Sequence, residues 1–150
     1  MKVKHALKVM LWFICTFHVV MGLGLIILSG DFVDSVAKMY GAVVNEWSAQ
    51  FLYILRPLGV FMLALGVLAG GAALHPERNR LTIYVFAGIF TLRALQRVIF
   101  GTTIQETFGI DSGRNIGNMI LFFGMAAVLV VLDQLVCRGC CGEKPSTSAD

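Results

Sequence analysis

The chain has 150 residues, of which 57% are hydrophobic and only 14% are charged. A soluble globular domain carries about 25% charged residues, and a disordered chain is poor in apolar residues. The composition therefore excludes both classes and is typical of an integral membrane protein. The net charge of +3 is modest, so the positions of the basic residues are more informative than their sum.

The first apolar run covers about residues 6–28 and follows a short basic opening with Lys2, Lys4 and Lys8. A helix needs about 20 apolar residues to cross the ~30 Å hydrocarbon layer of a membrane. The run is longer than the ~7–15 apolar residues of a secretory signal peptide, and it lacks a small-x-small cleavage site. We therefore expect a retained membrane span.

The next segment connects the first run to the second and has amphipathic character between Phe32 and Tyr40. Such a pattern favours a short helix that lies at the membrane interface.

Three further apolar runs divide the rest of the chain. They cover about residues 51–74, 81–100 and 115–136. A tight polar turn with Pro76 as the breaker separates the first two of these runs, and a polar loop at 101–114 precedes the last. The sequence predicts an all-α fold in which residues 1–136 form a four-helix transmembrane bundle. Residues 137–150 then form a cysteine-containing cytoplasmic tail that is disordered at its end.

The basic residues are distributed unevenly between the two sides of this bundle. One side holds Lys2, Lys4, Lys8, Arg78, Arg80, Arg138 and Lys144. The other side holds Lys38 and Arg114, with the carboxylates of Asp31, Asp34, Glu46, Glu106 and Asp111. Loops rich in lysine and arginine remain in the cytoplasm. We therefore expect both termini in the cytoplasm, in a multi-pass protein of the plasma (inner) membrane of a bacterium.

A recurring pattern bears on how the helices are arranged. Arginine, glycine, leucine and glycine recur at the same spacing from Arg56 and from Arg114. A parallel repeat of two helical hairpins explains this echo, and so does coincidence, because glycine and leucine are common in membrane helices. The small-x-x-x-small step from Gly66 to Gly70 favours close packing of helices, within one bundle or between subunits.

The third apolar run carries two arginines and a glutamine among its apolar side chains. Arg93, Gln96 and Arg97 have the i, i+3, i+4 spacing that places them on one face of a helix. At about 1.5 Å of rise per residue, Arg56 lies near the depth of Arg97, and His18 lies near the midplane below Arg93. Charged side chains at membrane depth usually face the bundle interior. We therefore expect a basic pocket of Arg56, Arg93, Gln96 and Arg97 in the outer half of the bundle, with His18 at its floor.

Three interpretations of this pocket remain open. In the first, the arginines pair with the outer-loop carboxylates of Glu46, Glu106, Asp31 or Asp34, or their long stems reach the interface. In the second, the guanidinium groups bind an anion or a headgroup, because their paired donors suit carboxylate and phosphate. A lipid, a quinone-like molecule or an acidic small substrate fits this interpretation. In the third, the pocket lies on a transport or proton path that uses His18.

Asp133, near the end of the fourth run, is a further charge inside an apolar segment. We expect it to reach the cytoplasmic interface or to pair with Arg78, Arg80 or Lys8.

The tail contains a C-x-x-C pattern at Cys137 and Cys140, followed by Cys141. A structural zinc site takes four ligands, and no second pair is present, so we predict no metal site. Free thiols, S-palmitoylation beside basic residues and thiol–disulfide chemistry remain open for this tail.

Motifs for nucleotide binding, metalloprotease activity or an esterase nucleophile are absent. The basic residues are not interleaved with exposed aromatic residues, so nucleic-acid binding is excluded. We predict no cofactor apart from a bound lipid or quinone, and we expect a non-enzymatic role.

Three short motifs carry a family resemblance. They are Arg56-Pro57-Leu58-Gly59, the turn from His75 to Arg80, and the stretch from Arg93 to Arg97. Together they resemble the small four-helix bacterial membrane proteins grouped as DoxX-like or BphX-like, over roughly residues 8–136. The resemblance implies a four-helix membrane fold, and some DoxX-type proteins are accessory subunits of thiol or quinone redox complexes. The cysteine tail is not part of this pattern.

Three functions are consistent with these features. The first is an accessory or assembly subunit of a membrane complex that binds a lipid or quinone-like molecule. The alternatives are a small transporter for an anionic solute and a membrane thiol-redox partner. Expected partners are membrane lipids, together with other membrane subunits or a second copy of the chain.

Overall fold

The computed structural model describes residues 2–28, 30–44 and 46–141, with side chains described up to residue 138. Within these residues the chain is all-helical, as predicted. The helices are α1 (Lys2–Ile27), α2 (Gly30–Tyr40), α3 (Ala49–Leu74), α4 (Arg80–Ile99), α5 (Gly101–Phe108) and α6 (Ser112–Cys141). Four of them, α1, α3, α4 and α6, are long and apolar enough to cross a membrane. This property indicates an integral membrane protein.

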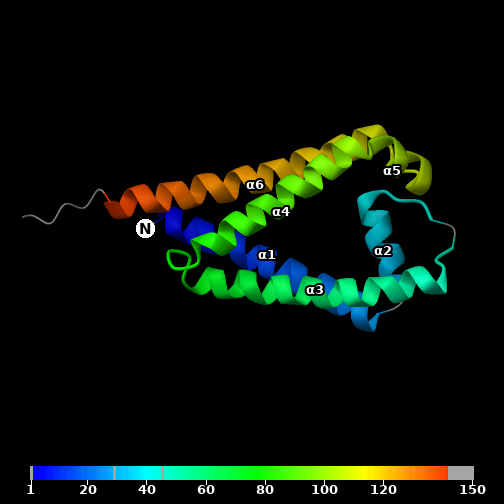
Figure 1. Cartoon of the computed structure of the whole chain (residues 1–150), viewed down its shortest axis with the longest axis horizontal. Helices are drawn as coiled ribbons and strands as arrows, with labels where there is room; N and C mark the ends of the chain where they lie inside the picture. Colours follow the sequence, from blue (N-terminus) through cyan, green and yellow to red (C-terminus); the bar gives the residue numbers. More distant parts are fainter. Residues whose placement is uncertain (1, 29, 45, 142–150) are drawn as a thin grey trace, which may run out of the picture.

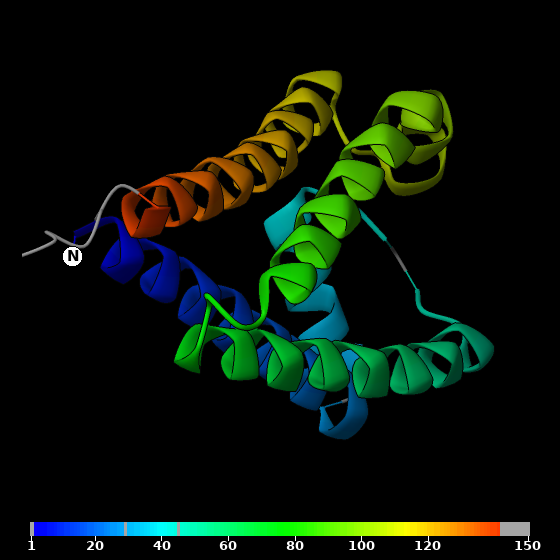
Figure 2. The ribbon, with the colours of Figure 1, turned by 60° about the vertical axis from the view of Figure 1, so that its left-hand side comes forward.

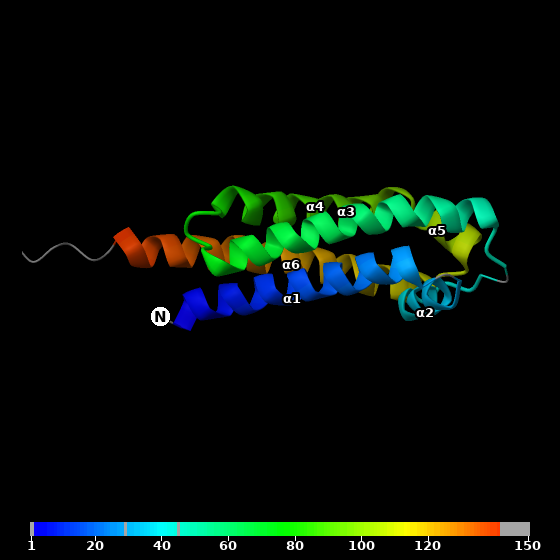
Figure 3. The same ribbon diagram turned by 90° about the horizontal axis from the view of Figure 1, so that it is seen from below.

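The four long helices form two pairs. α1 packs mainly against α3, α4 packs mainly against α6, and α1 also contacts α6. The start of α1, the end of α6 and the turn between α3 and α4 lie together at one end of the bundle, here called the terminal end (Figures 1 and 3). α2 and α5 lie at the opposite end, the α2–α5 end. From the turn that joins them, α3 and α4 diverge (Figure 2).

Close approach of α1 and α3 depends on glycine. A Cβ atom on Gly22 would lie 2.8 Å from the backbone oxygen of Gly59, and a Cβ on Gly59 would lie 2.8 Å from the backbone oxygen of Gly22. A Cβ on Gly66 would lie 2.7 Å from the side chain of Val19. Lipid tails are as apolar as leucine, so helices in membranes associate through such close backbone contact. These glycines therefore act within the bundle.

The core lies where the two pairs meet. Its larger side chains come from α1, α4 and α6, and α3 contributes small ones. They are Leu7, Leu11, Ile14, Ile83, Phe86, Phe90 and Leu129, with Ala69, Ala72 and Ala73. Many large apolar side chains are instead exposed on the outside, among them Phe61 and Val67 of α3 and Leu92 of α4. In a membrane these exposed faces contact lipid.

The short helix expected after the first span is present as α2. Its Val33 is buried, and Val36, Ala37 and Tyr40 on the same side line a partly open cavity. The helix ends where Gly41 adopts a left-handed conformation with φ of 83°, which glycine adopts without the steric cost of a side chain. The amphipathic pattern therefore reflects packing against the bundle.

The prediction of a polar loop over residues 101–114 is wrong at both ends, because residues 101–108 form α5 and α6 begins at Ser112. Ile104 and Phe108 lie one turn apart on this helix and face the cavity. Gly109 ends the helix in a left-handed conformation with φ of 62°. Two apolar residues among polar ones give too weak a periodic signal to separate a helix of eight residues from a loop.

α6 continues to Cys141, past residue 136 where the fourth span was expected to end. The first part of the predicted tail is therefore helical. The remainder of that tail, residues 142–150, lies outside the described part of the chain.

Candidate functional site

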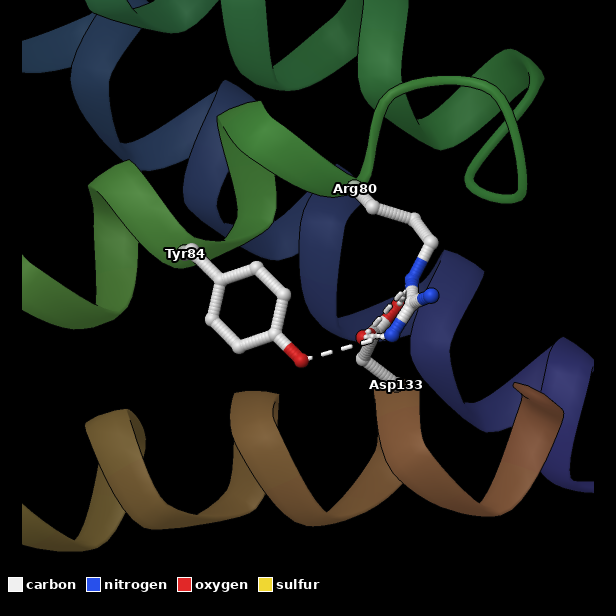
Figure 4. A network of polar contacts seen from close by, with 3 residues as sticks. All are labelled: Arg80, Tyr84 and Asp133. Atoms are coloured by element: carbon white, nitrogen blue, oxygen red, sulfur yellow. Dashed lines mark hydrogen bonds and ion pairs between the residues drawn. The ribbon is translucent and has the colours of Figure 1, made fainter. Parts of the chain in front are cut away.

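An ion pair joins α4 to α6 near the terminal end. Arg80 donates from Nη2 to Oδ2 of Asp133 at 2.9 Å and from Nε to the same oxygen at 3.1 Å. The Asp133 side chain is only 3% exposed, whereas the Arg80 side chain is 42% exposed. Arg80 also contacts the hydroxyl of Tyr84 at 3.4 Å (Figure 4). This pairing is one of those expected for Asp133, and it neutralises a carboxylate that would otherwise be buried alone.

The turn before α4 places Arg80 for this contact. Asn79 donates from its side chain to the backbone oxygen of His75 at 3.0 Å, and Pro76 is buried. Lys4 of α1 pairs with Glu77 at 3.3 Å, which ties the turn to the first helix. A hydrogen bond from its own backbone N–H, together with Lys4, lowers the pKa of Glu77.

A cavity of about 680 Å³ lies between the helix pairs at the α2–α5 end. Aliphatic and aromatic side chains from α1, α2, α3 and α5 form most of its wall. They include Phe17, Met21, Leu25, Val33, Val36, Tyr40, Phe51, Leu55, Leu58, Met62, Ile104 and Phe108, with Trp47 from the segment before α3. Ligand pockets of ~300–1,000 Å³ with such apolar lining commonly hold small molecules.

The polar part of the wall comes from α4. Arg93, Gln96 and Arg97 all line the cavity, so the helical spacing correctly places them on one face. Arg97 donates to the Oδ1 of Asn115 in α6 at 2.9 Å, and the Asn115 side chain donates back to the Arg97 backbone oxygen at 3.3 Å. The Arg97 guanidinium also lies 5.7 Å from the ring centre of Tyr40. These neutral groups orient Arg97 but leave its charge uncompensated.

Arg93 is half-buried, and its guanidinium lies 5.1 Å from the ring centre of Phe122. Across the described ranges, Arg93 makes no side-chain hydrogen bond, and neither Arg93 nor Arg97 forms an ion pair with a carboxylate. Asp34, one of the acids expected to pair with an arginine, instead pairs with Lys38 at 2.6 Å. The pocket thus holds two positive charges one helical turn apart, facing aromatic rings and an amide.

Two residues expected in this pocket lie elsewhere. His18 is 3% exposed and is packed against Phe86 and Phe90 of α4. Its Nδ1 lies 2.8 Å from the backbone oxygen of Ile14, one turn back in α1. Arg56 is exposed and is not among the cavity-lining residues of α3. The depth of a residue along a helix does not determine which way the helix turns it about its axis. In α1 and α3 this rotation places His18 and Arg56 outside the cavity wall.

Other contributors to the site carry only weak sequence signals. Tyr40 and Phe122 present aromatic faces to the arginines, but an aromatic residue in an apolar run resembles any core residue. Asn115 and Phe122 have the i, i+7 spacing of one helix face. Their shared helix face contacts Arg97 and Arg93 of α4. The i, i+7 spacing is therefore the sequence feature that could have assigned both residues to one site.

The cysteines provide no metal centre among the described residues, where no group of three or more His, Cys, Asp or Glu side chains is close enough to hold a metal ion. Cys15 and Cys137 are free thiols and are half-buried. Cys140 and Cys141 lie in the last turn of α6, and their side chains lie outside the described part.

Comparison of the chain with protein-family models, with curated proteins and with solved structures finds no match. The resemblance to DoxX-like proteins therefore depends on the three short motifs alone.

Proposed function

We propose that this integral membrane protein binds an amphiphilic molecule, a lipid or a quinone-like compound, in the cavity at the α2–α5 end. In this proposal it acts as an accessory or assembly subunit of a larger membrane complex and performs no catalysis itself. The observation that carries the proposal is an apolar cavity whose polar wall holds Arg93 and Arg97 without a protein carboxylate. An amphiphile matches both parts of this wall, because its tail suits the apolar side chains and its head suits the arginines.

The exposure of the lining residues indicates where a ligand enters. Most are half-buried or buried, whereas Phe51 and Leu58 of α3 and Gln96 of α4 are exposed. The opening therefore lies between α3 and α4, where the two helices diverge (Figure 2). Both helices expose apolar side chains nearby, including Phe61 and Leu92. Entry from the bilayer favours an amphiphile over the water-soluble substrate of a transporter.

The site is distant from the thiols that a redox function would need. Cys137 lies near the end of α6 at the terminal end, and the cavity lies at the opposite end. The thiol-redox alternative therefore has no structural link to this cavity.

The proposal also includes an orientation. Lys2, Lys4 and Lys8 lie at the terminal end with the 75–79 turn, and basic segments remain in the cytoplasm. The terminal end would then face the cytoplasm, with both termini inside, and the cavity would lie in the outer half of the membrane.

Membership of a complex is motivated by the wide apolar faces of the bundle. Short connections leave little room for an independent catalytic domain. Partners would pack on the exposed apolar side chains of α3 and α6, such as Val60 and Ile120, which are 58% and 62% exposed.

Purification in a mild detergent followed by native mass spectrometry tests the binding function. The wild-type chain is expected to retain an amphiphile, and Met62→Trp is expected to retain less of it because the larger ring takes up part of the cavity. Val67→Trp on the exposed side of α3 is the matched control and should retain the molecule. Absence of any bound amphiphile from the wild type, or equal retention in both variants, would contradict the proposal.

A further inference from the structure

The two arginines of the cavity differ sharply from the third arginine of α4. Arg80 contacts Asp133, so its charge is matched within the protein. Arg93 and Arg97 lie further along the same helix, toward the α2–α5 end, about 20 Å and 26 Å from Arg80 at 1.5 Å of rise per residue. Within the part of the chain that the structure describes, neither has a carboxylate partner. Charges inside a membrane are rare and are usually paired, so these two arginines suit an anionic ligand.

Arg93 lines the cavity, and its side chain makes no hydrogen bond to the described residues. The centre of its guanidinium lies 5.1 Å from the centre of the Phe122 ring, a cation–π distance. A guanidinium presents paired donors that match the two oxygens of a carboxylate or phosphate. In contrast, Arg97 already uses one donor on Asn115. Arg93 therefore has more donors available than Arg97, which adds a second positive charge one turn away.

The facing helix holds another unused donor. Asn118 lies between Asn115 and Phe122 on the α6 face that meets α4, and its Nδ2 is buried without a hydrogen-bond partner. A buried donor without an acceptor is costly. Asn118 is not among the residues that line the cavity, so the donors that a ligand in the cavity can reach are those of Arg93 and Arg97.

From these contacts we propose that the occupant of the cavity is an anionic lipid with a carboxylate or phosphate head. The head is bound by Arg93 with the help of Arg97, and the tail passes out between α3 and α4 into the bilayer. This inference rests on the proposed function and narrows it to one chemical class. A neutral head would leave the two positive charges unmatched. A free anion shares the head chemistry but would leave the apolar wall formed by residues such as Leu55 and Met62 unfilled.

Matched single-tailed probes test this inference with the full-length, delipidated protein in a nonionic detergent. Native mass spectrometry would compare hexadecanoate with hexadecanol, which share a tail and differ in head charge. Acetate and inorganic phosphate would test the head chemistry without a tail. We expect hexadecanoate to bind at least about tenfold more tightly than hexadecanol, because hydrogen bonds to charged groups are the stronger ones. Acetate and phosphate should bind more weakly than hexadecanoate.

Variants identify the residue responsible. Arg93→Gln is expected to reduce the preference for hexadecanoate to less than about threefold. Arg56→Gln, an exposed arginine outside the cavity, should leave the preference unchanged. Arg93→Lys keeps the charge but not the paired donors, and we expect an intermediate preference. Thermal unfolding of each variant, measured beside that of the wild type, shows whether a loss of binding reflects loss of the fold.

The outcomes separate this inference from the proposed function. Equal binding of the acid and the alcohol would overturn the anionic head but leave an amphiphile site in place. Failure of both tailed probes to bind the wild type would overturn both proposals. Binding of acetate or phosphate as tight as that of hexadecanoate would overturn the role of the tail. An acid preference that survives Arg93→Gln would overturn the assignment of the head to Arg93.

Discussion

Replacing Arg80 should destabilise the protein more than replacing its partner Asp133. The Asp133 side chain is 3% exposed and the Arg80 side chain is 42% exposed. Arg80→Leu leaves a carboxylate buried without a counter-charge, and breaking a buried pair in this way costs about 3–5 kcal/mol. Asp133→Leu leaves an arginine that can turn toward water or lipid headgroups. Its cost is closer to that of lost hydrogen bonds to a charged group, about 1.5–3 kcal/mol.

The double variant sharpens this comparison. Replacing a buried pair with apolar side chains of similar volume is often neutral or stabilising. Arg80→Leu with Asp133→Leu should therefore recover most of the stability that Arg80→Leu loses, because no charge remains buried. The strength of the recovery measures how much of the loss comes from the isolated carboxylate.

The free energy of unfolding would be measured in mixed micelles by titration with a denaturing detergent, with helicity as the readout. We expect the order wild type, Asp133→Leu, Arg80→Leu from most to least stable, with the double variant above Arg80→Leu. An equal or larger loss for Asp133→Leu, or a double variant no more stable than Arg80→Leu, would refute the assigned roles.

Three further predictions concern packing, pH and the site. Gly22→Leu should lower the free energy of unfolding by about 1–3 kcal/mol through overpacking against α3. Gly88→Ala, at a position with open space around it, should be neutral or stabilising. Equal effects of the two variants in thermal unfolding would refute the close packing at Gly22. The pKa of Glu77 is lowered from its ordinary value of 4.5, so the ionised side chain stabilises the fold fully at pH values above 4.5. This contribution disappears as the pH falls through the lowered pKa. Glu77→Gln should therefore flatten the acid limb of stability against pH; an unchanged limb would contradict this. Phe122→Leu should weaken hexadecanoate binding several-fold, because it removes the ring over Arg93; unchanged affinity would count against the ring's role.

Sequence reasoning identified the spans because the hydropathy of a run depends on its composition and length, both of which are read directly. It also identified the shared face of Arg93, Gln96 and Arg97, because helical spacing alone determines it. The pairing of Asp133 with Arg80 was one of several expected contacts. The expected partners of Asp133 were limited to basic residues at the terminal end, because Asp133 lies near the end of the fourth apolar run on that side of the bundle.

The rotation of each helix about its axis could not be predicted in the same way. Depth counting placed His18 and Arg56 beside the arginines, but packing of α1 against α4 places His18 among aromatic rings, and Arg56 faces outward. α5 was expected as a loop because it has only two apolar residues, Ile104 and Phe108. Their contact with the cavity becomes visible only in the folded structure. Such features depend on tertiary contacts that a single sequence does not contain.

We propose that an anion-headed lipid in the cavity neutralises Arg93 and Arg97. An experimental density map of the protein, purified from native membranes in a mild detergent, would show whether this lipid is present. We predict elongated density in the cavity, with its head within hydrogen-bonding distance of the Arg93 guanidinium and its tail directed between α3 and α4. A map in which Arg93 pairs with a carboxylate of the protein, or in which side chains close the cavity, would contradict the claim.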